Sequence, residues 1–279
     1  LLLVVLSVLM AGSRAWADTN VFSTPGGDWT NAARWSLGHV PVDGEDVVVD
    51  DDVLLTNDTA SLLSCVVNPG RTVTFDTLAS VMTSVTVVVS GVVTHALNTD
   101  TNTCTYTNAS GVWLGSMNAQ VKVVCSNLTV ASGGQINGYG KGFQGGSAST
   151  VPGAGPGGGQ TLGNNASAGG GHIGKGGRAD RVRVYGPAYD AAAFPVWPGS
   201  GSGGGHNNGN AHGGGLVLIE ASGHCLINGS IDMRGTDCTV GGHAGGGGGG
   251  GVNITCRTFG GTNGAIRVDG GSCLISGGW

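Results

Sequence analysis

The stretch LVLIEASGHCLING at residues 216–229 aligns without a gap on GAIRVDGGSCLISG at residues 264–277, which lies 48 residues further along the chain. Each copy is an apolar run, a Gly-containing turn and a second apolar run that begins at Cys225 or Cys273. Because such a strand–turn–strand unit cannot bury its apolar face alone, the copies must stack. The repeat therefore predicts an all-β chain folded as a right-handed parallel β-helix, a solenoid in which each 48-residue unit supplies one or two coils.

Residues 18–132 are a succession of short Val-rich runs separated by polar turns, as at residues 47–49, 87–89 and 121–124. β-Branched and apolar residues bounded by Asp, Asn, Gly, Ser or Thr are typical of strands. No stretch keeps a helical period over a useful length. We expect residues 18–132 to form the Val-rich N-terminal part of the solenoid.

Residues 133–279 contain 48 of the 57 glycines, and strand-like islands such as residues 216–220 and 253–256 interrupt the glycine runs. Glycine loses the most entropy on folding, so ordered glycine runs must pack tightly. A polyproline II segment has three residues per turn and no internal hydrogen bonds, and nearly bare segments of this kind can bond backbone to backbone. We expect a Gly-rich repeat solenoid with polyproline II-like loops, truncated at its C-terminus.

The overall composition excludes several classes of protein. The glycines do not fall at every third position, which excludes collagen. Charged residues make up only 10% of the chain and hydrophobic residues 39%, which does not suit a disordered polyampholyte. With 12 Lys and Arg residues and a net charge of -5, the chain has no electrostatic footprint for nucleic acid.

Residues 1–17 have the pattern of a secretory signal peptide. An apolar run, Leu1 to Met10, is followed by the small-x-small site Ala15-Trp16-Ala17. The run is shorter than the roughly 20 apolar residues that a membrane-spanning helix needs, and no later segment is a candidate. We expect a mature chain that begins near Asp18 and is secreted to the extracellular space or the cell surface, and we interpret the sequence as a fragment.

The seven cysteines of an exported chain are better explained as disulfide partners than as metal ligands. Cys225 and Cys273 hold equivalent positions in the two copies of the repeat. Stacked strands lie about 4.8 Å apart, within the range of roughly 4.4 to 6.8 Å between the Cα atoms of a disulfide. We therefore expect a bridge between them, although Cys238 and Cys256 compete for the same partners. Buried thiols that act as small hydrophobic side chains are the alternative.

Six Asn-x-Ser/Thr sequons are candidate N-glycosylation sites if the source is eukaryotic. Their acceptor residues are Asn57, Asn108, Asn127, Asn165, Asn228 and Asn253.

The segment DWTNAARWSLGHVPVDGEDVVV at residues 28–49 carries a resemblance to known families. It resembles the Trp, Gly-x-Val-Pro and Gly-x-Asp pattern that opens many secreted β-helix proteins, including autotransporter passengers. It is also similar to the start of the G8 domain, a β-rich extracellular module. The Gly-rich half resembles surface proteins in which a glycine run, a strand, a turn and a strand recur. This resemblance implies an adhesin or matrix component and carries over no catalytic residue.

Two groups of polar residues are candidate metal sites. The first is a cluster of carboxylates around one short strand: Asp43, Glu45, Asp46, Asp50, Asp51 and Asp52. Ca²⁺ needs about six to eight oxygen ligands. The spacing of known calcium loops is absent, so solvated turn carboxylates are favoured. Imidazoles follow the glycine runs at His172, His206 and His243, and His212 lies close to His206 in the sequence. Polar side chains that cover or hydrogen-bond the Gly-rich backbone are favoured over a metal site built from these imidazoles. No cofactor is predicted, and Ca²⁺ is the alternative.

Arg181 and Arg183 lie two residues apart, so on a strand they share one face, which suits an acidic glycan; a solvated strand face is the alternative. β-Helical polysaccharide lyases and hydrolases need clustered Asp, Arg or Lys residues, but Glu220 aligns with Val268 at the 48-residue offset. We predict a non-enzymatic structural or adhesive protein whose repetitive β-face binds glycans or other surface and matrix proteins, with lateral self-assembly. A carbohydrate-active β-helix enzyme is the alternative.

Overall fold

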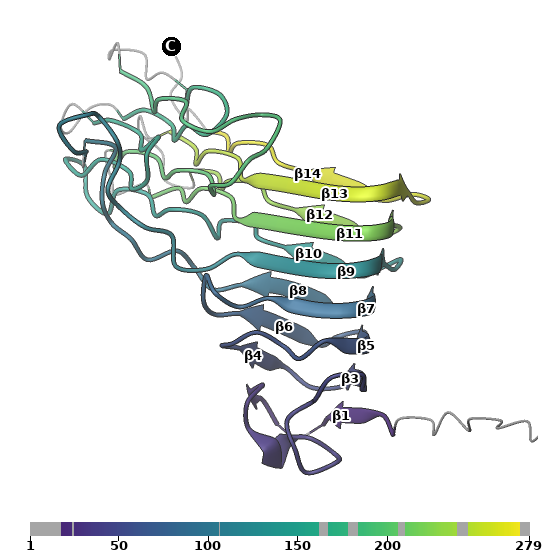
Figure 1. The fold of residues 1–279 in the computed structure, drawn as a ribbon. Helices are drawn as coiled ribbons and strands as arrows, with labels where there is room; N and C mark the ends of the chain where they lie inside the picture. Colours follow the sequence, from purple (N-terminus) through teal and green to yellow (C-terminus); the bar gives the residue numbers. More distant parts are fainter. Residues whose placement is uncertain are drawn as a thin grey trace, which may run out of the picture.

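The computed structural model describes residues 18–23, 25–105, 107–161, 167–177, 184–205, 210–238 and 245–273. In this part of the chain the regular structure is almost entirely β, and one 3-10 helix, η1 (Ala32–Arg34), is the only helical element. The strands form two parallel sheets that rise coil by coil from the N-terminal end (Figure 1). The all-β prediction is confirmed. The predicted signal peptide, residues 1–17, lies outside the described residues.

The chain alternates between the two sheets, so odd strands stack on odd strands and even strands on even strands. The first sheet contains β1 (Asn20–Phe22), β3 (Asp46–Val49), β5 (Leu62–Val67), β7 (Met82–Val89), β9 (Val121–Val130), β11 (Leu216–Ile227) and β13 (Gly251–Gly260). The second sheet contains β2 (Gly27–Asp28), β4 (Val53–Leu55), β6 (Thr72–Phe75), β8 (Val92–His95), β10 (Gln135–Asn137), β12 (Ser230–Asp232) and β14 (Ala265–Arg267). No helix in the described ranges is long and apolar enough to cross a bilayer.

The core lies between the two sheets because successive side chains of a strand point to opposite faces. In β3 and β5, buried residues alternate with more exposed ones, and the buried positions of neighbouring strands are in register. One such inward row runs across five strands of the first sheet as Val47, Cys65, Val87, Leu128 and Cys225. Each large apolar side chain buried in this way contributes roughly 1.5–3 kcal/mol, so the register of every coil is fixed by the coil before it.

The two corners of each coil differ in length. The turns that lead from an odd strand to the next even strand contain only two to four residues. All long insertions lie at the opposite corner, where 25 residues join β8 to β9, 78 join β10 to β11 and 18 join β12 to β13. The glycine-rich insertions therefore gather on one side of the upper coils (Figure 1).

The 48-residue unit predicted from the sequence is wrong. Leu216 lies opposite Gly251, an offset of 35 residues, and Ser230 lies opposite Ala265 with the same offset. After a register shift within the strand, Cys225 lies opposite Phe259. Cys273 lies opposite Cys238 in an isolated parallel β-bridge of the backbone. The sequence alignment matched the two Cys-Leu-Ile triplets, but the register follows the apolar residues that face the core. In β13 these core-facing residues begin at Val252. The predicted equivalence of Cys225 and Cys273, and with it the basis for a bridge between them, is not found.

The residues inserted between β10 and β11 fold into a layer built from extended glycine-rich segments. The backbone N–H groups of residues 199–204 donate to three different neighbours in turn, and groups three residues apart share one neighbour. Gly199 and Ser202 donate to residues 214 and 211. Residues 200 and 203 donate to residues 171 and 168, and residues 201 and 204 donate to residues 154 and 151. A cycle of three residues is the period of a polyproline II helix.

The carbonyl groups of the same central segment accept from three further segments. Phe143 and Gly146 donate to residues 199 and 202, Gly248 donates to Ser200, and Gly159 donates to Gly201. The central segment thus bonds to six neighbouring stretches of chain: residues 142–146, 151–154, 157–159, 168–171, 211–214 and 245–250. A buried N–H or C=O group needs a hydrogen-bond partner, and this arrangement supplies partners to the backbone of the central segment without a sheet or a helix.

Glycine is required in the layer because neighbouring backbones approach too closely for a side chain. A Cβ atom at any of several glycines would lie less than 3.0 Å from a carbonyl oxygen of another segment; examples are Gly199, Gly201, Gly213, Gly214, Gly247 and Gly249. Gly174 and Gly177, by contrast, have nothing within 4 Å of the same position. The expectation that the glycine runs pack as ordered structure agrees with these contacts.

His95 connects the coils to the layer. Its imidazole is fully buried, Nδ1 lies 2.7 Å from the carbonyl oxygen of Ala96, and the backbone N–H of Leu216 donates to Nε2 over 3.2 Å. The ring therefore holds the place where the glycine-rich insertion returns to β11. Burial, with a smaller contribution from the nearby Lys141, lowers the pKa of His95 to about 4.

We expect Gly247→Val and Gly249→Val, singly or combined, to destabilise the protein strongly. Each new side chain would meet the carbonyl oxygen of His212 or Val268, and overpacking of this kind costs about 1–3 kcal/mol or more per site. Thermal denaturation should show a drop in Tm of roughly 2–12 °C for each substitution. Gly177→Val is the control, since its Cβ position is open. An unchanged Tm in the Gly247/Gly249 double variant would contradict the packed layer.

We also expect stability to fall as the pH is lowered from about 6.5 to about 4. The unfolded His95 takes up a proton near pH 6.5, whereas the folded protein resists protonation until about pH 4. The unfolded state therefore binds more protons in this window, and the linkage is worth up to about 3 kcal/mol. His212, whose pKa burial also lowers, acts in the same direction.

The measurement is urea unfolding at a series of pH values for the wild type and for His95→Gln. The carboxylates whose pKa is lowered, such as Asp28 and Asp232, lose their contribution only below about pH 4 and do not interfere. The variant should keep only a shallow slope between pH 4 and 6.5. Equal slopes in the two proteins would show that His95 is not the group responsible.

Candidate functional site

The outward face of the first sheet carries a groove of about 780 Å³. A row of four lining residues crosses it on neighbouring strands β7, β9, β11 and β13: Thr83, Val124, Glu220 and Thr255 are successive partners in the parallel register. Leu218 and Asn253 form a second row beside it. The groove thus follows directly from strand alternation, since the residues between these positions face the core.

The lining of the groove is a mixture of hydroxyl, amide and aliphatic groups. Among the described residues that line it, Glu220 is the only acidic one. Its Oε1 atom lies 4.0 Å from Nζ of Lys122 on the neighbouring strand, and both side chains are partly exposed. An exposed pair of this kind contributes little stability, so both groups are available to a bound molecule.

Val196, from the loop that precedes the central glycine segment, forms one wall of the groove. Asp190 holds this loop. Its Oδ2 atom accepts hydrogen bonds from the backbone N–H groups of Val196 and Trp197, each over 2.9 Å. The same oxygen lies 3.0 Å from Nε2 of His172, and both side chains are almost completely buried. The His172–Asp190 pair therefore holds the backbone of the loop that carries Val196.

Packing fixes the same loop from both sides. The Trp197 ring makes an edge contact with Trp113 at 5.6 Å between centroids, and Trp113 in turn contacts Phe143 at 5.2 Å. Pro195 lies so close to Gly251 at the start of β13 that a Cβ there would come within 3.2 Å of it. The wall of the groove is therefore tied to the glycine layer and to the sheet.

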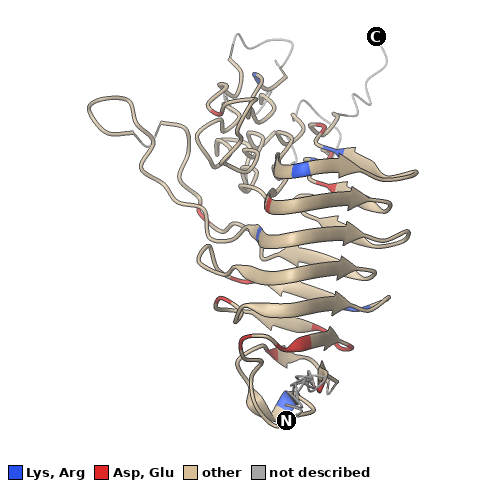
Figure 2. Cartoon of the chain, turned by 45° about the vertical axis from the view of Figure 1, so that its right-hand side comes forward, with Lys and Arg blue, Asp and Glu red and all other residues tan. Residues whose placement is uncertain are grey.

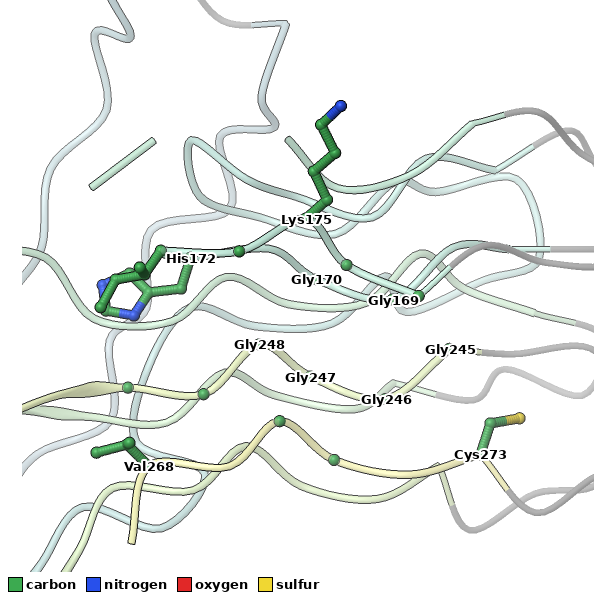
Figure 3. Close-up of a pocket in the computed structure, with 18 of the residues that line it drawn as sticks. Gly169, Gly170, His172, Lys175, Gly245, Gly246, Gly247, Gly248, Val268 and Cys273 are labelled. Carbon is green, nitrogen blue, oxygen red and sulfur yellow. The ribbon is translucent and has the colours of Figure 1, made fainter. Parts of the chain in front are cut away.

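A second cavity, of about 490 Å³, lies among the glycine-rich segments 169–177, 245–250 and 268–273 (Figure 3). Thirteen of its 19 lining residues are glycine. The Lys175 side chain points away from residues 245–248 (Figure 3), and its Nζ atom lies 4.5 Å from the centre of the Tyr185 ring. This cavity therefore offers a ligand mostly backbone, and the groove is the stronger candidate.

The sequon asparagines are distributed over the molecule. Asn57 and Asn108 are exposed, whereas Asn127, Asn228 and Asn253 are partly buried. The Oδ1 atoms of Asn108, Asn127 and Asn228 accept backbone N–H groups. Asn253 is the only one of these that lines the groove. Asn165 and the predicted glycan-binding residues Arg181 and Arg183 lie outside the described residues.

The acidic cluster at residues 43–52 does not converge on one point. Asp43 accepts the backbone N–H of Ser61, Asp46 accepts the hydroxyl of Ser64, and Asp50 accepts the amide of Asn68. Each of these partners lies 18 residues ahead, on the next coil. Figure 2 shows this acidic end and the largely uncharged ribbon above it. In the described ranges no group of three or more His, Cys, Asp or Glu side chains is arranged to hold a metal ion.

Sequence reasoning missed the groove and the loop that forms its wall. The outward positions Thr83 and Val124 do alternate with buried residues, but the alignment of their strands depends on a register that no local pattern gives. The role of Asp190 depends on contacts with residues six and seven positions later and with His172. A carboxylate shortly before Val196 and Trp197 was the one available signal.

No protein-family model, curated protein or solved structure matches this chain.

We expect Asp190→Ala to free the loop that carries Val196 while leaving the coils intact. The substitution removes the acceptor for two backbone N–H groups and the partner of His172; hydrogen bonds to a charged group contribute about 1.5–3 kcal/mol each. Hydrogen exchange of the Val196 and Trp197 amides should accelerate by roughly tenfold or more. Asp76→Ala, an exposed carboxylate, is the control. Unchanged exchange at both amides would contradict this role of Asp190.

Proposed function

We propose that this protein is a non-enzymatic, secreted or cell-surface structural protein of adhesive type. Its outward β-face binds glycans or other extracellular chains in the groove on the first sheet. The glycine layer acts as a rigid, weakly charged support and as a surface for lateral association of copies. The row Thr83, Val124, Glu220 and Thr255 carries this proposal, because it presents side chains of neighbouring coils in a straight line.

The proposed fold is a right-handed parallel β-helix whose glycine layer is built from polyproline II segments. Parallel strands joined by crossover connections are right-handed in about 98% of cases, which supports the handedness. The three-residue hydrogen-bond cycle of residues 199–204 supports the polyproline II geometry. Both features give the groove a stiff base that needs little ordering when a ligand binds, and this favours affinity.

The groove suits an extended ligand that lies across the strands. Neighbouring strands are about 4.8 Å apart, so side chains in the row recur at that interval. Val124 and Leu218 offer apolar surface to the C–H faces of a sugar, while Thr83, Asn253 and Thr255 offer hydroxyl and amide groups to its oxygens. Glu220 adds one negative charge to the lining, and Lys122, which lies next to it, carries the opposite charge. A neutral or weakly charged polymer fits this lining better than a strongly charged one.

Binding without chemistry is favoured over glycoside cleavage. Glycosidases generally use two carboxyl groups that flank the scissile bond, and Glu220 is the single acidic residue in the described lining. The carbohydrate-active alternative is addressed by assaying for released sugars in the binding experiment below.

Asn253 connects the groove to the predicted glycosylation. Because this asparagine lines the groove, an N-glycan attached to it would occupy the space that a ligand needs. Modification at Asn253 and ligand binding in the groove therefore exclude each other.

The test is binding of the full chain to a panel of immobilised neutral and acidic polysaccharides and extracellular matrix proteins. Val124→Arg places a long charged side chain in the middle of the row and should weaken binding at least tenfold. Val88→Arg is a matched control, because Val88 is also a partly buried, outward valine of the first sheet but does not line the groove.

Equal loss of binding in the two variants, or no loss in Val124→Arg, would contradict a binding site in the groove. The appearance of shortened oligosaccharides on incubation with wild-type protein would instead favour the enzyme.

A further inference from the structure

Cys238 and Cys273 lie on neighbouring coils and in the same register as the strands that precede them. Ser230 of β12 pairs with Ala265 of β14, and Cys238 bridges Cys273 in parallel, with the same offset of 35 residues. The stacking of these two coils therefore continues beyond the strands, as far as the two cysteines.

Hydrogen bonds hold the two segments together along this path. The backbone N–H groups of Met233, Gly235 and Cys238 donate to the carbonyl groups of residues 267, 269 and 272 of the next coil, over 2.8 to 3.0 Å. These contacts keep the two segments at the spacing of neighbouring parallel strands, about 4.8 Å. That spacing lies within the range of roughly 4.4 to 6.8 Å between the Cα atoms of a disulfide.

A side-chain clamp lies next to both cysteines. Asp237 Oδ1 accepts the backbone N–H of Ser272 over 2.6 Å and its hydroxyl over 3.0 Å. These hydrogen bonds lower the pKa of Asp237, so the clamp is in place at neutral pH. Asp237 and Ser272 directly precede Cys238 and Cys273, and the clamp therefore fixes the two cysteine backbones relative to each other.

The two cysteines also share an apolar environment. Cys238 is almost fully buried and packs with Ala211 and the partly buried Cys273 in a small cluster separate from the main core. Cys273 lines the glycine cavity, so a small reagent has a route to its sulfur atom. This combination of a sheltered site and one reachable thiol suits disulfide formation.

No other two of the seven cysteines are partners in the register. Cys65 lies opposite Val47 and Val87, and Cys225 lies opposite Leu128 and Phe259. Cys125 and Cys256 lie opposite Ala221 from its two sides, so a whole strand separates them. Burial raises the pKa of Cys65 and of Cys225 to about 12 and that of Cys125 to about 11, which disfavours the reactive thiolate.

We propose that Cys238 and Cys273 form a disulfide that joins the coil of β12 to the coil of β14 at the edge of the glycine layer. A small disulfide such as oxidised glutathione is the oxidant. One thiolate attacks it and releases a first glutathione thiol; the second cysteine then displaces the other glutathione and closes the S–S bond. Two cysteine thiols are thereby oxidised and one glutathione disulfide is reduced to two thiols.

The disulfide closes a loop that contains β13 and the glycine segment 245–250. A loop of this length restricts the unfolded chain considerably, so the bridge should stabilise the segments that surround the central residues 199–204. In the cell the bridge depends on the extracellular location proposed above, because it needs an oxidising compartment. Its formation in vitro depends only on the geometry.

The experiment uses the full chain, reduced, then oxidised with glutathione disulfide and alkylated before digestion. Mass spectrometry should find the peptides of Cys238 and Cys273 joined, and Cys65 and Cys225 alkylated only after unfolding. Thermal denaturation of the oxidised protein should give a Tm roughly 6–12 °C above that of the reduced protein. This difference should vanish in Cys238→Ser and in Cys273→Ser and persist in Cys256→Ser.

Full alkylation of both cysteines after oxidation, or a link from either to a different cysteine, would overturn the proposal. Peptide mapping of the wild type gives this answer even if a serine variant fails to fold. The groove is lined by other residues than Cys238 and Cys273. A bridge without binding would therefore refute the proposed function alone, and binding without a bridge would refute only the disulfide.

Discussion

Every buried backbone N–H and C=O group must find a partner, and this chain meets the requirement in two ways that share one scaffold. In the coils, parallel strands bond to the coil above and the coil below. In the glycine layer, successive groups of the central segment 199–204 bond to different neighbours, so that six stretches of chain surround it. At many positions the second solution needs a residue without a Cβ atom, because the segments approach one another there too closely for a side chain. The high glycine content of the layer is therefore a consequence of its backbone hydrogen-bonding pattern.

The layer and the candidate site are parts of one structure. The short turns at one corner join the two sheets directly, and the long insertions at the other corner supply both the layer and the loop that carries Val196. Asp190, Trp197 and Pro195 fix that loop against the layer and against β13. The groove thus has a floor made by the coils and a wall made by the insertion. Neither half of the sequence builds it alone.

The sequence was informative where local chemistry decides the structure. The Val-rich runs gave the strands of the first coils, such as β3 and β7, because alternation of buried and outward residues is visible within a few residues. The packing of the glycine runs also followed from their composition. The repeat length and the pairing of Cys225 did not, because register is decided by residues far apart in the chain: β9 and β11 are separated by the whole inserted layer. The groove and the role of Asp190 were out of reach for the same reason.

The order in which these contacts become available along the chain has a kinetic consequence. The first coils close over 18 to 27 residues, whereas the central segment needs partners from residue 143 to residue 248, and His95 meets Leu216 across 121 positions. Loop-closure entropy must be overcome before such distant contacts stabilise anything. We therefore expect the lower coils to form early and the glycine segments to stay solvated until β13 has folded. The layer should then form after the lower coils, so that the wall of the groove is completed late in folding.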